Sequence, residues 1–435
     1  MRVLLLIAGR SKRFWPLSEK TLFPICGTNL LEITTGRLKE AGLHDIILIG
    51  GAHNLGEVSD RYPQFPSIEQ KDLELGMRGA LLDALPQCGS EAVMIVCVND
   101  VIESDAYKHL IASSKQSGTQ GALLAQRVKS YFPGGYLQLE NGRIASVIEK
   151  PKKGSEPSDL VNIVAHVHSD AALLLEELQK VKDGTDDGYE QALDALFKKH
   201  TYNAVPYEGV WQAVKYPWHI LELLPILLED VTSQHIHPSA EIHPTAVIDG
   251  PVIIEENAKV FPFATIKGPC AIGKRSIIAN NALVRGSSIG DDCVVGYTSE
   301  IKSSVLHSHV WTHSSYIGDS VIGSNVSFGA GSVTGNLRLD EGEIDSNVQG
   351  EEIKTGLIKF GTAIGSHCRL GIHCGINPGK KIGSGAFIGS HVLVGEDIPD
   401  SSFVTMKKGE MCVKPNRSKV PLPEERNAFR NKISR

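Results

Sequence analysis

Several features that would narrow the function at once are missing from this sequence of 435 residues. Its eight cysteines are scattered and form no Cys-x-x-Cys pair, so we expect reduced thiols in the protein core. No apolar run reaches the roughly 18 residues of a membrane span, and the first run stops at Gly9, too early for a signal segment. The net charge of −6 offers no positive field to nucleic acid or a membrane. We therefore expect a cytoplasmic protein whose partners are small molecules or copies of itself.

The first half of the chain predicts an α/β domain, which we place at residues 1–232. Three continuous apolar runs are typical of strands in a parallel sheet that is covered on both faces. They are Arg2–Ile7, Asp45–Ile49 and Ala92–Val98. Between the first two, a helix is expected over Asn29–Ala41, with Asn29 as its N-cap and Gly42 as its stop. The chain is long enough for at least one further domain.

From His235 onward the sequence repeats with a period of six. Isoleucine or valine stands at every sixth position, and a mostly small residue follows four positions later. The apolar positions are Ile236, Ile242, Ile248, Ile254, Val260, Ile266, Ile272, Ile278 and Val284. After a slip of one residue the period resumes at Ile289, and it resumes again at Ile364. Period six fits neither an α-helix nor a flat strand, so we predict a parallel β-helix over residues 235–405.

Two segments depart from this repeat. Residues Asn336–Lys359 interrupt it and are expected to form a protruding loop. Residues 406–435 are basic and contain proline, and either a partly ordered tail or a functional segment fits them. Within the repeat, His367-Cys368 and His373-Cys374 suggest a metal site, but their six-residue separation is the coil period. We therefore expect these four side chains to occupy equivalent positions of the coil.

Two places in the first half suit a phosphate or a metal ion. The apolar run Val3–Ile7 is followed by Gly9 and a basic loop, whose backbone N–H groups can form a nest for an anion. Asp100 comes directly after a buried strand, at the edge where open α/β sheets bind ligands. We assign no chemistry to Trp211.

The loop AGRSKRFWPLSEK resembles the signature A-G-x-G-x-R-x-x-P-L-x-x-x-P-K of sugar-1-phosphate nucleotidyltransferases, with a shortened spacer. Together with the hexapeptide repeat, it makes the chain similar to the bifunctional bacterial or archaeal enzymes that make UDP-N-acetylglucosamine from glucosamine-1-phosphate. In that family a Rossmann-like, mainly parallel α/β domain precedes a left-handed parallel β-helix. The resemblance extends to about residue 400.

This resemblance implies two sets of ligand contacts in the first half. The nucleotide contacts are Ala8, Gly9, Arg13, Lys20, Gln70 and Gly76, with Arg13 and Lys20 as the catalytic cations on the phosphates. The sugar-phosphate contacts are Gly135, Glu149, Lys150 and Asn162. Asp100 would hold Mg²⁺. The implied reaction is in-line attack of the sugar-phosphate oxygen on the α-phosphorus of UTP or dTTP, with release of pyrophosphate.

Departures from the family pattern affect this site. The family places a second metal ligand in W-x-D-V, where this chain has WQAV and therefore Ala213. Ser11, Asn99 and Met77 also replace the usual glycine, glycine and threonine. One carboxylate together with phosphates and water can still hold Mg²⁺. Both a working transferase and a domain that binds a nucleotide sugar without turnover therefore stay open.

The segment THSSYIGDSVIGSNVSFGAGSVTGN resembles the family's acetyltransferase motif, H-x-x-Y-x-G-D followed by G-A-G-[ST] and then N. By this match His313 is the general base. Contacts to the amino sugar phosphate and its charge would come from Tyr316, Asn336, Arg285, Lys302 and Lys359, with Glu300 nearby, and contacts to acetyl-CoA from Ala330 and Ser332. An ammonium group cannot attack a thioester, so a proton must be removed, and an imidazole that titrates near neutrality suits that role.

The resemblance therefore implies a bifunctional enzyme. It would N-acetylate glucosamine-1-phosphate or a similar amino-sugar-1-phosphate with acetyl-CoA and then transfer a uridylyl or thymidylyl group to the product. The family's β-helices associate, so a homotrimer is implied as well. Neither the base nor the sugar can be fixed from the sequence. A non-enzymatic regulatory subunit is the remaining alternative, and the motif around His313 argues against it.

Overall fold

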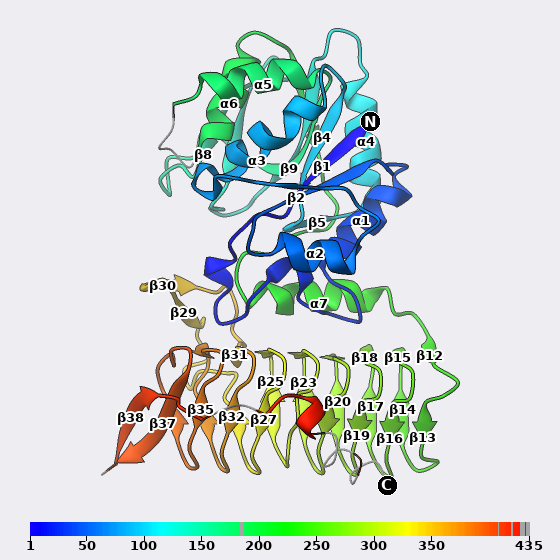
Figure 1. Cartoon of the computed structure of the whole chain (residues 1–435), viewed down its shortest axis with the longest axis vertical. Coiled ribbons are helices and arrows are strands. Elements are labelled where there is room, and N and C mark those ends of the chain that lie inside the picture. The colour runs from blue at the N-terminus through cyan, green and yellow to red at the C-terminus, as the bar shows by residue number, and fades with distance from the viewer. Residues whose placement is uncertain (183–186, 408, 419–420, 427–430, 432–435) are drawn as a thin grey trace. The chain divides into compact units, whose positions relative to one another are not determined.

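The computed structural model describes residues 1–182, 187–407, 409–418, 421–426 and 431. The chain divides into two compact units, the first comprising Met1–Arg10 and Leu30–Ala213, the second Ser11–Asn29 and Val214–Arg435 (Figure 1). Residues 11–29 and 214–232, which the sequence led us to place in the α/β domain, thus pack with the β-helix. Within the described residues, no helix is both long and apolar enough to cross a membrane.

The first unit is built on a nine-stranded sheet in the order β3-β2-β1-β4-β9-β6-β10-β8-β7. Its strands are β1 (Arg2–Leu6), β2 (Ile46–Gly50), β3 (Ser67–Glu69), β4 (Val93–Cys97), β6 (Gly121–Arg127), β7 (Gly135–Glu140), β8 (Arg143–Glu149), β9 (Leu160–His168) and β10 (Tyr202–Pro206). The three predicted strands appear as β1, β2 and β4, and β1 pairs in parallel with the other two. The other edge adds antiparallel pairs around β9 and β8. Separately, β5 (Asp100–Ile102) pairs with β11 (Trp211–Ala213).

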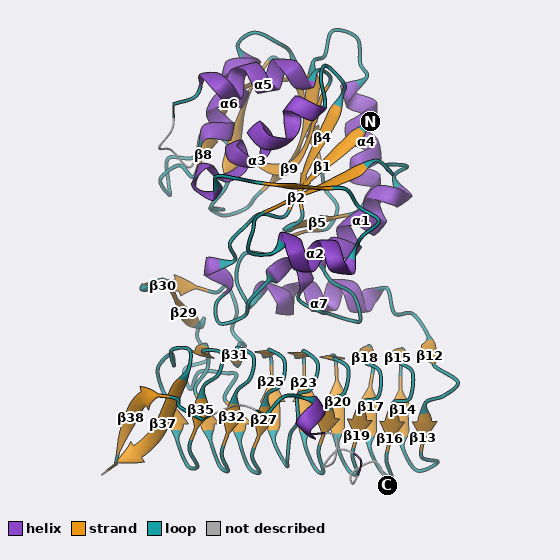
Figure 2. Cartoon of the chain, in the orientation of Figure 1, coloured by secondary structure: helices purple, strands orange, loops and turns teal. Residues whose placement is uncertain are grey.

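Helices cover the sheet of the first unit (Figure 2). They are α1 (Leu30–Glu40), α2 (Leu55–Arg61), α3 (Gly76–Ala84), α4 (Ser104–Ser114), α5 (Ala171–Lys180) and α6 (Gly188–Phe197). The predicted first helix is α1, and Gly42 takes the left-handed φ of +82° that ends it. Leucines and alanines of α3, α5 and α6 share one buried core with Leu4, Leu6 and Ile95 of the sheet. The strands β1, β2 and β4 are buried at nearly every position, which explains why they are continuously apolar.

The second unit is the β-helix predicted from the period of six. One face carries β12 (Gln234–Ile236), β15 (Val252–Ile254), β18 (Cys270–Ile272), β21 (Ser288–Ile289), β24 (Val305–Leu306), β26 (Val321–Ile322), β31 (Thr362–Ile364) and β34 (Lys380–Ile382). A second face carries β14 (Val247–Asp249), β17 (Thr265–Lys267), β20 (Leu283–Arg285), β23 (Glu300–Lys302), β25 (Tyr316–Gly318), β28 (Val333–Thr334), β33 (Gly375–Ile376) and β36 (Leu393–Val394). The third face carries β13 (Glu241–Ile242), β16 (Lys259–Val260), β19 (Ile277–Ile278) and β22 (Val294–Val295), then β27 (Ser327–Phe328), β32 (Arg369–Leu370), β35 (Phe387–Ile388), β37 (Ser402–Lys407) and β38 (Glu410–Pro415). Isolated bridges of Trp311 to Val294 and Ser327 join the two parts of this third face.

The repeating apolar residues form the core of the β-helix. Ile254 pairs with Ile272 one full coil later, and both are at most 1% exposed. The slip of one residue appears as a shorter coil, in which Ile272 pairs with Ile289. The first coil is less buried, since Ile236 has no preceding coil to cover it and is 38% exposed. The side chains of each coil therefore pack chiefly on those of the next.

Each of the two segments that depart from the repeat contributes to a β-hairpin. Residues 336–359 contain an antiparallel hairpin of β29 (Asp345–Val348) and β30 (Glu351–Lys354), and an isolated bridge between Leu337 and Lys359 closes its base. The predicted tail begins within β37, which pairs with β38 as a hairpin on the third face. Residues 408, 419–420, 427–430 and 432–435 of that tail lie outside the described residues. The helix α7 (His219–Glu229) also belongs to this unit.

Candidate functional site

The signature loop is held in a left-handed conformation at the position where the family has its second glycine. Ser11 has φ of 51° and ψ of 19°. Its hydroxyl oxygen accepts a hydrogen bond from the backbone N–H of Lys20 at 3.4 Å. Glycine adopts such a conformation without steric cost, whereas serine does so at a modest one. The backbone at Ser11 thus has the left-handed conformation that a glycine would favour.

The two predicted phosphate cations differ in exposure. Arg13 is exposed, and its guanidinium carbon lies 6.0 Å from the ring centre of Tyr216. Lys20 is buried, with 8% of its surface exposed, at the start of a short 3₁₀ helix. Both belong to the second unit, whereas Ala8 and Gly9 belong to the first. A Cβ atom at Gly9 would meet no neighbour within 4 Å, so the packing around it leaves the backbone accessible.

Gln70 and Gly76 shape a turn in the segment predicted to read the base. The amide nitrogen of Gln70 donates to the carbonyl oxygens of Asp72 and Gly76, each at 2.8 Å. Gly76 has a φ of +54°, which favours glycine, and it begins α3. The Gln70 side chain is 4% exposed. Its N–H donors therefore hold the turn, and any contact with a base is left to the loop backbone or to the amide oxygen.

The predicted metal residue Asp100 lies at the start of β5. It stands directly opposite Ala213 in the antiparallel pair with β11. The indole N–H of Trp211, on the same strand as Ala213, donates to Asp100 Oδ1 at 2.9 Å. Trp211 thus orients this carboxylate, a role that gave no signal in the sequence. Within the described residues no three His, Cys, Asp or Glu side chains gather as a metal site.

Asp100 can supply one carboxylate ligand to a magnesium ion. Ala213 offers no oxygen, so this pair of strands supplies a single carboxylate. Magnesium in nucleotide enzymes commonly takes one or two carboxylates and completes its coordination with substrate phosphates and water. Asp100 can therefore hold an ion that arrives with a nucleotide.

The predicted sugar-phosphate residues of the first unit come together. Gly135 pairs with Glu149 across β7 and β8, and a Cβ built on Gly135 would lie 3.2 Å from Glu149 Oε2 and 3.7 Å from the Cβ of Asn162. Lys150 forms an ion pair with Glu149 at 3.1 Å. Glu190 of α6 was not predicted, although burial and the charge of Glu149 raise its pKa to about 7. A side chain at residue 135 would therefore crowd the Glu149 carboxylate, so Gly135 allows the carboxylate of Glu149 and the side chain of Asn162 to lie close together.

A second cluster lies on the β-helix, around the acetyltransferase motif. Lys302 Nζ contacts Asp319 Oδ2 at 2.7 Å, and both side chains are less than 20% exposed. The amide nitrogen of Asn336 donates to the same carboxylate and to Tyr316 Oη, the latter at 3.1 Å. Burial first, and then the charges of Asp319 and Glu300, raise the pKa of Tyr316. Tyr316 therefore keeps its proton and can donate it to a ligand.

Strand register brings the remaining predicted residues of this cluster into line. Arg285 of β20 pairs with Lys302 of β23, and Glu300 of β23 pairs with Tyr316 of β25. Arg285 donates to Glu300 Oε1 from Nε at 2.8 Å and from a terminal nitrogen at 2.6 Å. The sequence motif contains Asp319, but we assigned it no role. The structure makes it the link between Lys302 and Asn336.

Gly318 has a steric role in this cluster. A Cβ atom there would lie 2.4 Å from Tyr316 Oη and 2.9 Å from the amide nitrogen of Asn336. The absence of a side chain thus provides the space in which the Tyr316 hydroxyl meets Asn336. This explains the glycine of the Y-x-G-D motif.

His313 is exposed, three residues before Tyr316. Its neighbour Thr312 is buried and its hydroxyl donates to Ser299 Oγ at 3.1 Å, and the hydroxyl of Ser315 donates to the carbonyl of His313 at 3.0 Å. Buried hydroxyls on both sides thus fix the backbone while the imidazole faces solvent. Such a ring can exchange a proton with a bound amine.

The other predicted residues of the second half have different surroundings. Ser332 is fully buried, and its hydroxyl donates to the carbonyl of Gly371 at 2.7 Å. Its side chain therefore supports the coil, which leaves backbone contact as the way it could touch acetyl-CoA. Ala330 is exposed, and so is Lys359 at the base of the insertion. The rings of His373 and His391, which are 18 residues apart, stack at 5.2 Å in neighbouring coils. The prediction that a six-residue separation stacks His367-Cys368 on His373-Cys374 is wrong, because six residues span one face of the β-helix and a full coil takes 18.

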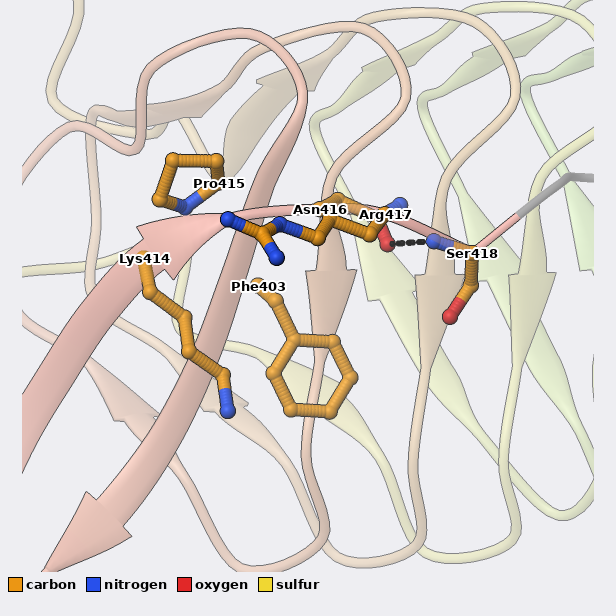
Figure 3. Close-up of a pocket in the computed structure, with 6 residues that line it drawn as sticks. All are labelled: Phe403, Lys414, Pro415, Asn416, Arg417 and Ser418. Atoms are coloured by element: carbon orange, nitrogen blue, oxygen red, sulfur yellow. Dashed lines mark hydrogen bonds between the residues drawn. The ribbon is translucent and has the colours of Figure 1, made fainter.

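Two pockets of the second unit contain none of the predicted residues. One of about 340 Å³ lies at the C-terminal hairpin, where Lys414 Nζ is 5.0 Å from the ring centre of Phe403 and Arg417 is adjacent (Figure 3). The other, of about 250 Å³, lies between Pro24–Gly27 and the first face of the β-helix. Neither was indicated by a motif.

These observations define a class of protein: an α/β unit with a phosphate-type loop, joined to a β-helix that carries an acyltransferase-type His, Tyr and Asn motif. Comparison with known proteins agrees. Residues 3–236 match the MobA-like NTP transferase domain. Residues 231–353 match the GMPPB C-terminal domain.

Two curated relatives match most of the chain. A bifunctional sugar-1-phosphate nucleotidylyltransferase/acetyltransferase of Sulfurisphaera tokodaii is 32% identical over 381 residues, which cover 86% of this chain and 92% of the relative. A bifunctional protein GlmU of Methanococcus maripaludis is 30% identical over 427 residues, which cover 96% and 100%. A solved apo UDP-glucose pyrophosphorylase aligns with a TM-score of 0.46 and 18% identity over 53% of this chain and 99% of its own. The chain belongs to the family of bifunctional nucleotidylyltransferase/acetyltransferases, as its motifs predicted.

Proposed function

We propose that this protein makes a UDP-N-acetylglucosamine-type product in two steps. The β-helix would N-acetylate glucosamine-1-phosphate or a similar amino-sugar-1-phosphate with acetyl-CoA, and the residues that match the nucleotidyltransferase pattern would then transfer a nucleotidyl group from UTP or dTTP. The two activities named for the relative from Sulfurisphaera tokodaii, nucleotidylyltransferase and acetyltransferase, support this proposal. The observation that carries it is the network of Lys302, Asp319, Asn336 and Tyr316 next to the exposed His313.

In the acetyl transfer, His313 acts as the general base. Its neutral imidazole takes a proton from the amine as the nitrogen attacks the carbonyl carbon of the thioester. The carbon–sulfur bond then breaks, and the thiolate of CoA leaves and takes up a proton. Arg285, Lys302 and Lys359 hold the sugar phosphate, and Glu300 and Asp319 keep two of these cations in place.

In the nucleotidyl transfer, an oxygen of the sugar phosphate attacks the α-phosphorus and pyrophosphate leaves. The nucleophile is already ionised, so no general base is needed. Arg13 and Lys20 offset the charge that builds up on the phosphates, while Glu149, Lys150 and Asn162 orient the sugar phosphate. Asp100 would hold Mg²⁺, whose chemistry here is to neutralise phosphate charge.

The same proposal includes the partners and the location. The substrates are small molecules, and neither nucleic acid nor a membrane is required. We propose a homotrimer associated through the β-helix in the cytoplasm. The long parallel faces of the β-helix support this arrangement, because a closed ring of three copies can use the same face of each.

A second candidate function keeps the acetyltransferase and treats the first unit as a nucleotide-sugar binder without turnover. The observation that favours it is the register that places Ala213 opposite Asp100. Two assays on the purified protein separate the candidates. Acetyl-CoA with glucosamine-1-phosphate should release free thiol, and UTP or dTTP with N-acetylglucosamine-1-phosphate and Mg²⁺ should release pyrophosphate. Thiol without pyrophosphate supports the second candidate, and neither product contradicts both.

The substitution His313→Ala tests the assignment of the base. It should reduce thiol release by about a hundredfold or more, because the general base is lost, and leave pyrophosphate release unchanged. Full thiol release by this variant would contradict the assignment. His391→Ala, at another exposed histidine of the β-helix, is the matched control.

A further inference from the structure

A buried chain of hydrogen bonds runs from the predicted sugar-phosphate residue Asn162 into the core of the first unit. The distances are 2.7 Å from Asn162 Oδ1 to His166 Nε2, 2.7 Å from His166 Nδ1 to Tyr189 Oη, 3.3 Å from Tyr189 Oη to His168 Nε2 and 2.9 Å from His168 Nδ1 to Tyr202 Oη. The histidines are 0% exposed and the tyrosines 1%. Burial lowers the pKa of both imidazoles, that of His168 to about 3, so both rings are neutral. Each ring therefore has one donor and one acceptor nitrogen.

A β-bulge makes the first link of this chain possible. In a regular strand, a rise of about 3.3 Å per residue would separate residues 162 and 166 by about 13 Å. In β9, however, His166 pairs with Leu123 of β6 while Ile163 pairs with the adjacent Leu124. Residues 164 and 165 are thus extra in β9, and the bulge brings the His166 ring to the Asn162 amide. Bulges commonly re-aim side chains next to functional sites.

The burial of Tyr202 sets the direction of every bond in the chain. Within the described residues, its hydroxyl has His168 Nδ1 as its hydrogen-bond partner. If that nitrogen carried a proton, the hydroxyl proton of Tyr202 would be buried without an acceptor, which is costly. Tyr202 therefore donates to His168, His168 to Tyr189, Tyr189 to His166 and His166 to Asn162 Oδ1. The amide oxygen of Asn162 is consequently turned inward.

We propose that this chain of hydrogen bonds, from Tyr202 to His166, orients the Asn162 side chain so that its amide nitrogen faces the sugar of the bound nucleotide sugar. The inference rests on the proposed function of the first unit. Within the described residues, the Asn162 side chain hydrogen-bonds to His166 through its oxygen, and its amide nitrogen has no hydrogen-bond acceptor. Gly135 lies beside the same side chain, since a Cβ built there would be 3.7 Å from the Asn162 Cβ. The sugar group that meets Asn162 must therefore accept a hydrogen bond, as a hydroxyl or carbonyl oxygen does. His166, Tyr189, His168 and Tyr202 are positioning residues and touch no substrate.

A double-mutant cycle tests the proposal with UDP-N-acetylglucosamine as the probe in calorimetric titrations of the full chain. Tyr202→Phe removes the donor that sets the direction, so affinity for the probe should fall about fivefold while affinity for UTP stays within about twofold. In an Asn162→Ala background, the same change should have no further effect. The matched control is Tyr207→Phe, which also loses a buried hydroxyl, bonded to Glu103 and not to the chain, and should bind the probe normally. An equal loss from Tyr202→Phe in both backgrounds overturns the proposal.

A second measurement needs no ligand. Nitrogen-15 spectra of the histidine-labelled protein should show the proton of both rings on Nε2, with signals assigned by their loss in His166→Gln and His168→Gln. Rings protonated on Nδ1 overturn the proposed direction whatever the binding results are. If wild-type protein binds neither UTP nor UDP-N-acetylglucosamine, the proposed function of the first unit is wrong, and the spectra still decide the direction of the chain.

Discussion

Ala213 stands directly opposite Asp100 in the antiparallel pair of β11 and β5. A carboxylate at residue 213 would therefore lie beside that of Asp100. We expect Ala213→Asp to lower the Mg²⁺ concentration needed for pyrophosphate release by about tenfold, because a second oxygen ligand is added. Pyrophosphate release measured against Mg²⁺ concentration checks this. Ala213→Val, which adds bulk without a ligand, is the control, and equal behaviour of the two variants would contradict the prediction.

Gly318→Ala should damage the acetyltransferase site selectively. The added methyl group would lie 2.4 Å from Tyr316 Oη, so the ring must move away from Asn336. We expect a rise of about tenfold in KM for the amino sugar phosphate, which corresponds to the loss of one or two hydrogen bonds. Gly395→Ala is a matched control on the same β-helix, since its Cβ would meet its nearest neighbour only at 3.7 Å. A normal KM for Gly318→Ala would show that Tyr316 does not contact the substrate.

Glu190→Gln should stabilise the first unit at alkaline pH. Burial, followed by the charge of Glu149, raises the pKa of Glu190 to about 7, so the folded state binds a proton that the unfolded state releases near pH 4.5. The wild-type protein therefore loses stability as pH rises between these two values, whereas glutamine does not titrate. We expect the free energy of unfolding to increase by up to about 3 kcal/mol at pH 8 and by less than about 1 kcal/mol at pH 5. Urea unfolding at both pH values measures it.

The control for that experiment is Glu140→Gln, at an exposed carboxylate on β7. It should leave the free energy of unfolding unchanged at both pH values. If Glu190→Gln behaves in the same way, the Glu190 carboxyl titrates freely in the folded protein.

The buried thiols should be inert in the folded protein. Burial raises the pKa of Cys293 and Cys368 to about 12 and that of Cys270 to about 11. Since the thiolate is the reactive form, these three buried thiols should not react with a disulfide reagent at pH 8 until the protein unfolds. Mass spectrometry of the labelled peptides measures this. Rapid labelling of Cys293 without denaturant would contradict the prediction.

The β-helix could be predicted almost residue by residue because each coil follows a local rule. A strand and a corner fit in six residues, and the inward position must be apolar, so Ile254 and Ile272 mark their coils without knowledge of distant contacts. Even the shorter coil between Ile272 and Ile289 was visible as a change of phase. The same reasoning located β1, β2 and β4, whose burial at nearly every position makes them continuously apolar.

Other features could not be predicted because they depend on partners far away in the sequence. Nothing near Trp211 indicates that its indole would reach Asp100, more than a hundred residues earlier. The bulge in β9 follows from its register with β6, and that register sets the contact of His166 with Asn162. The resemblance named Ser332 and Gln70 as ligand contacts, but it could not show that their side chains are used in the coil and the turn. The roles of the site residues toward substrates stay predictions.

The strands of each coil of the β-helix pair with strands of the coils before and after it. A ligand held by Arg285, Lys302 and Tyr316 would therefore span three successive coils, and each coil would supply one of its contacts. Replacement of a single coil can alter one part of the recognised molecule and leave the others intact. The preference for the acceptor sugar phosphate can therefore change through substitutions in one coil at a time.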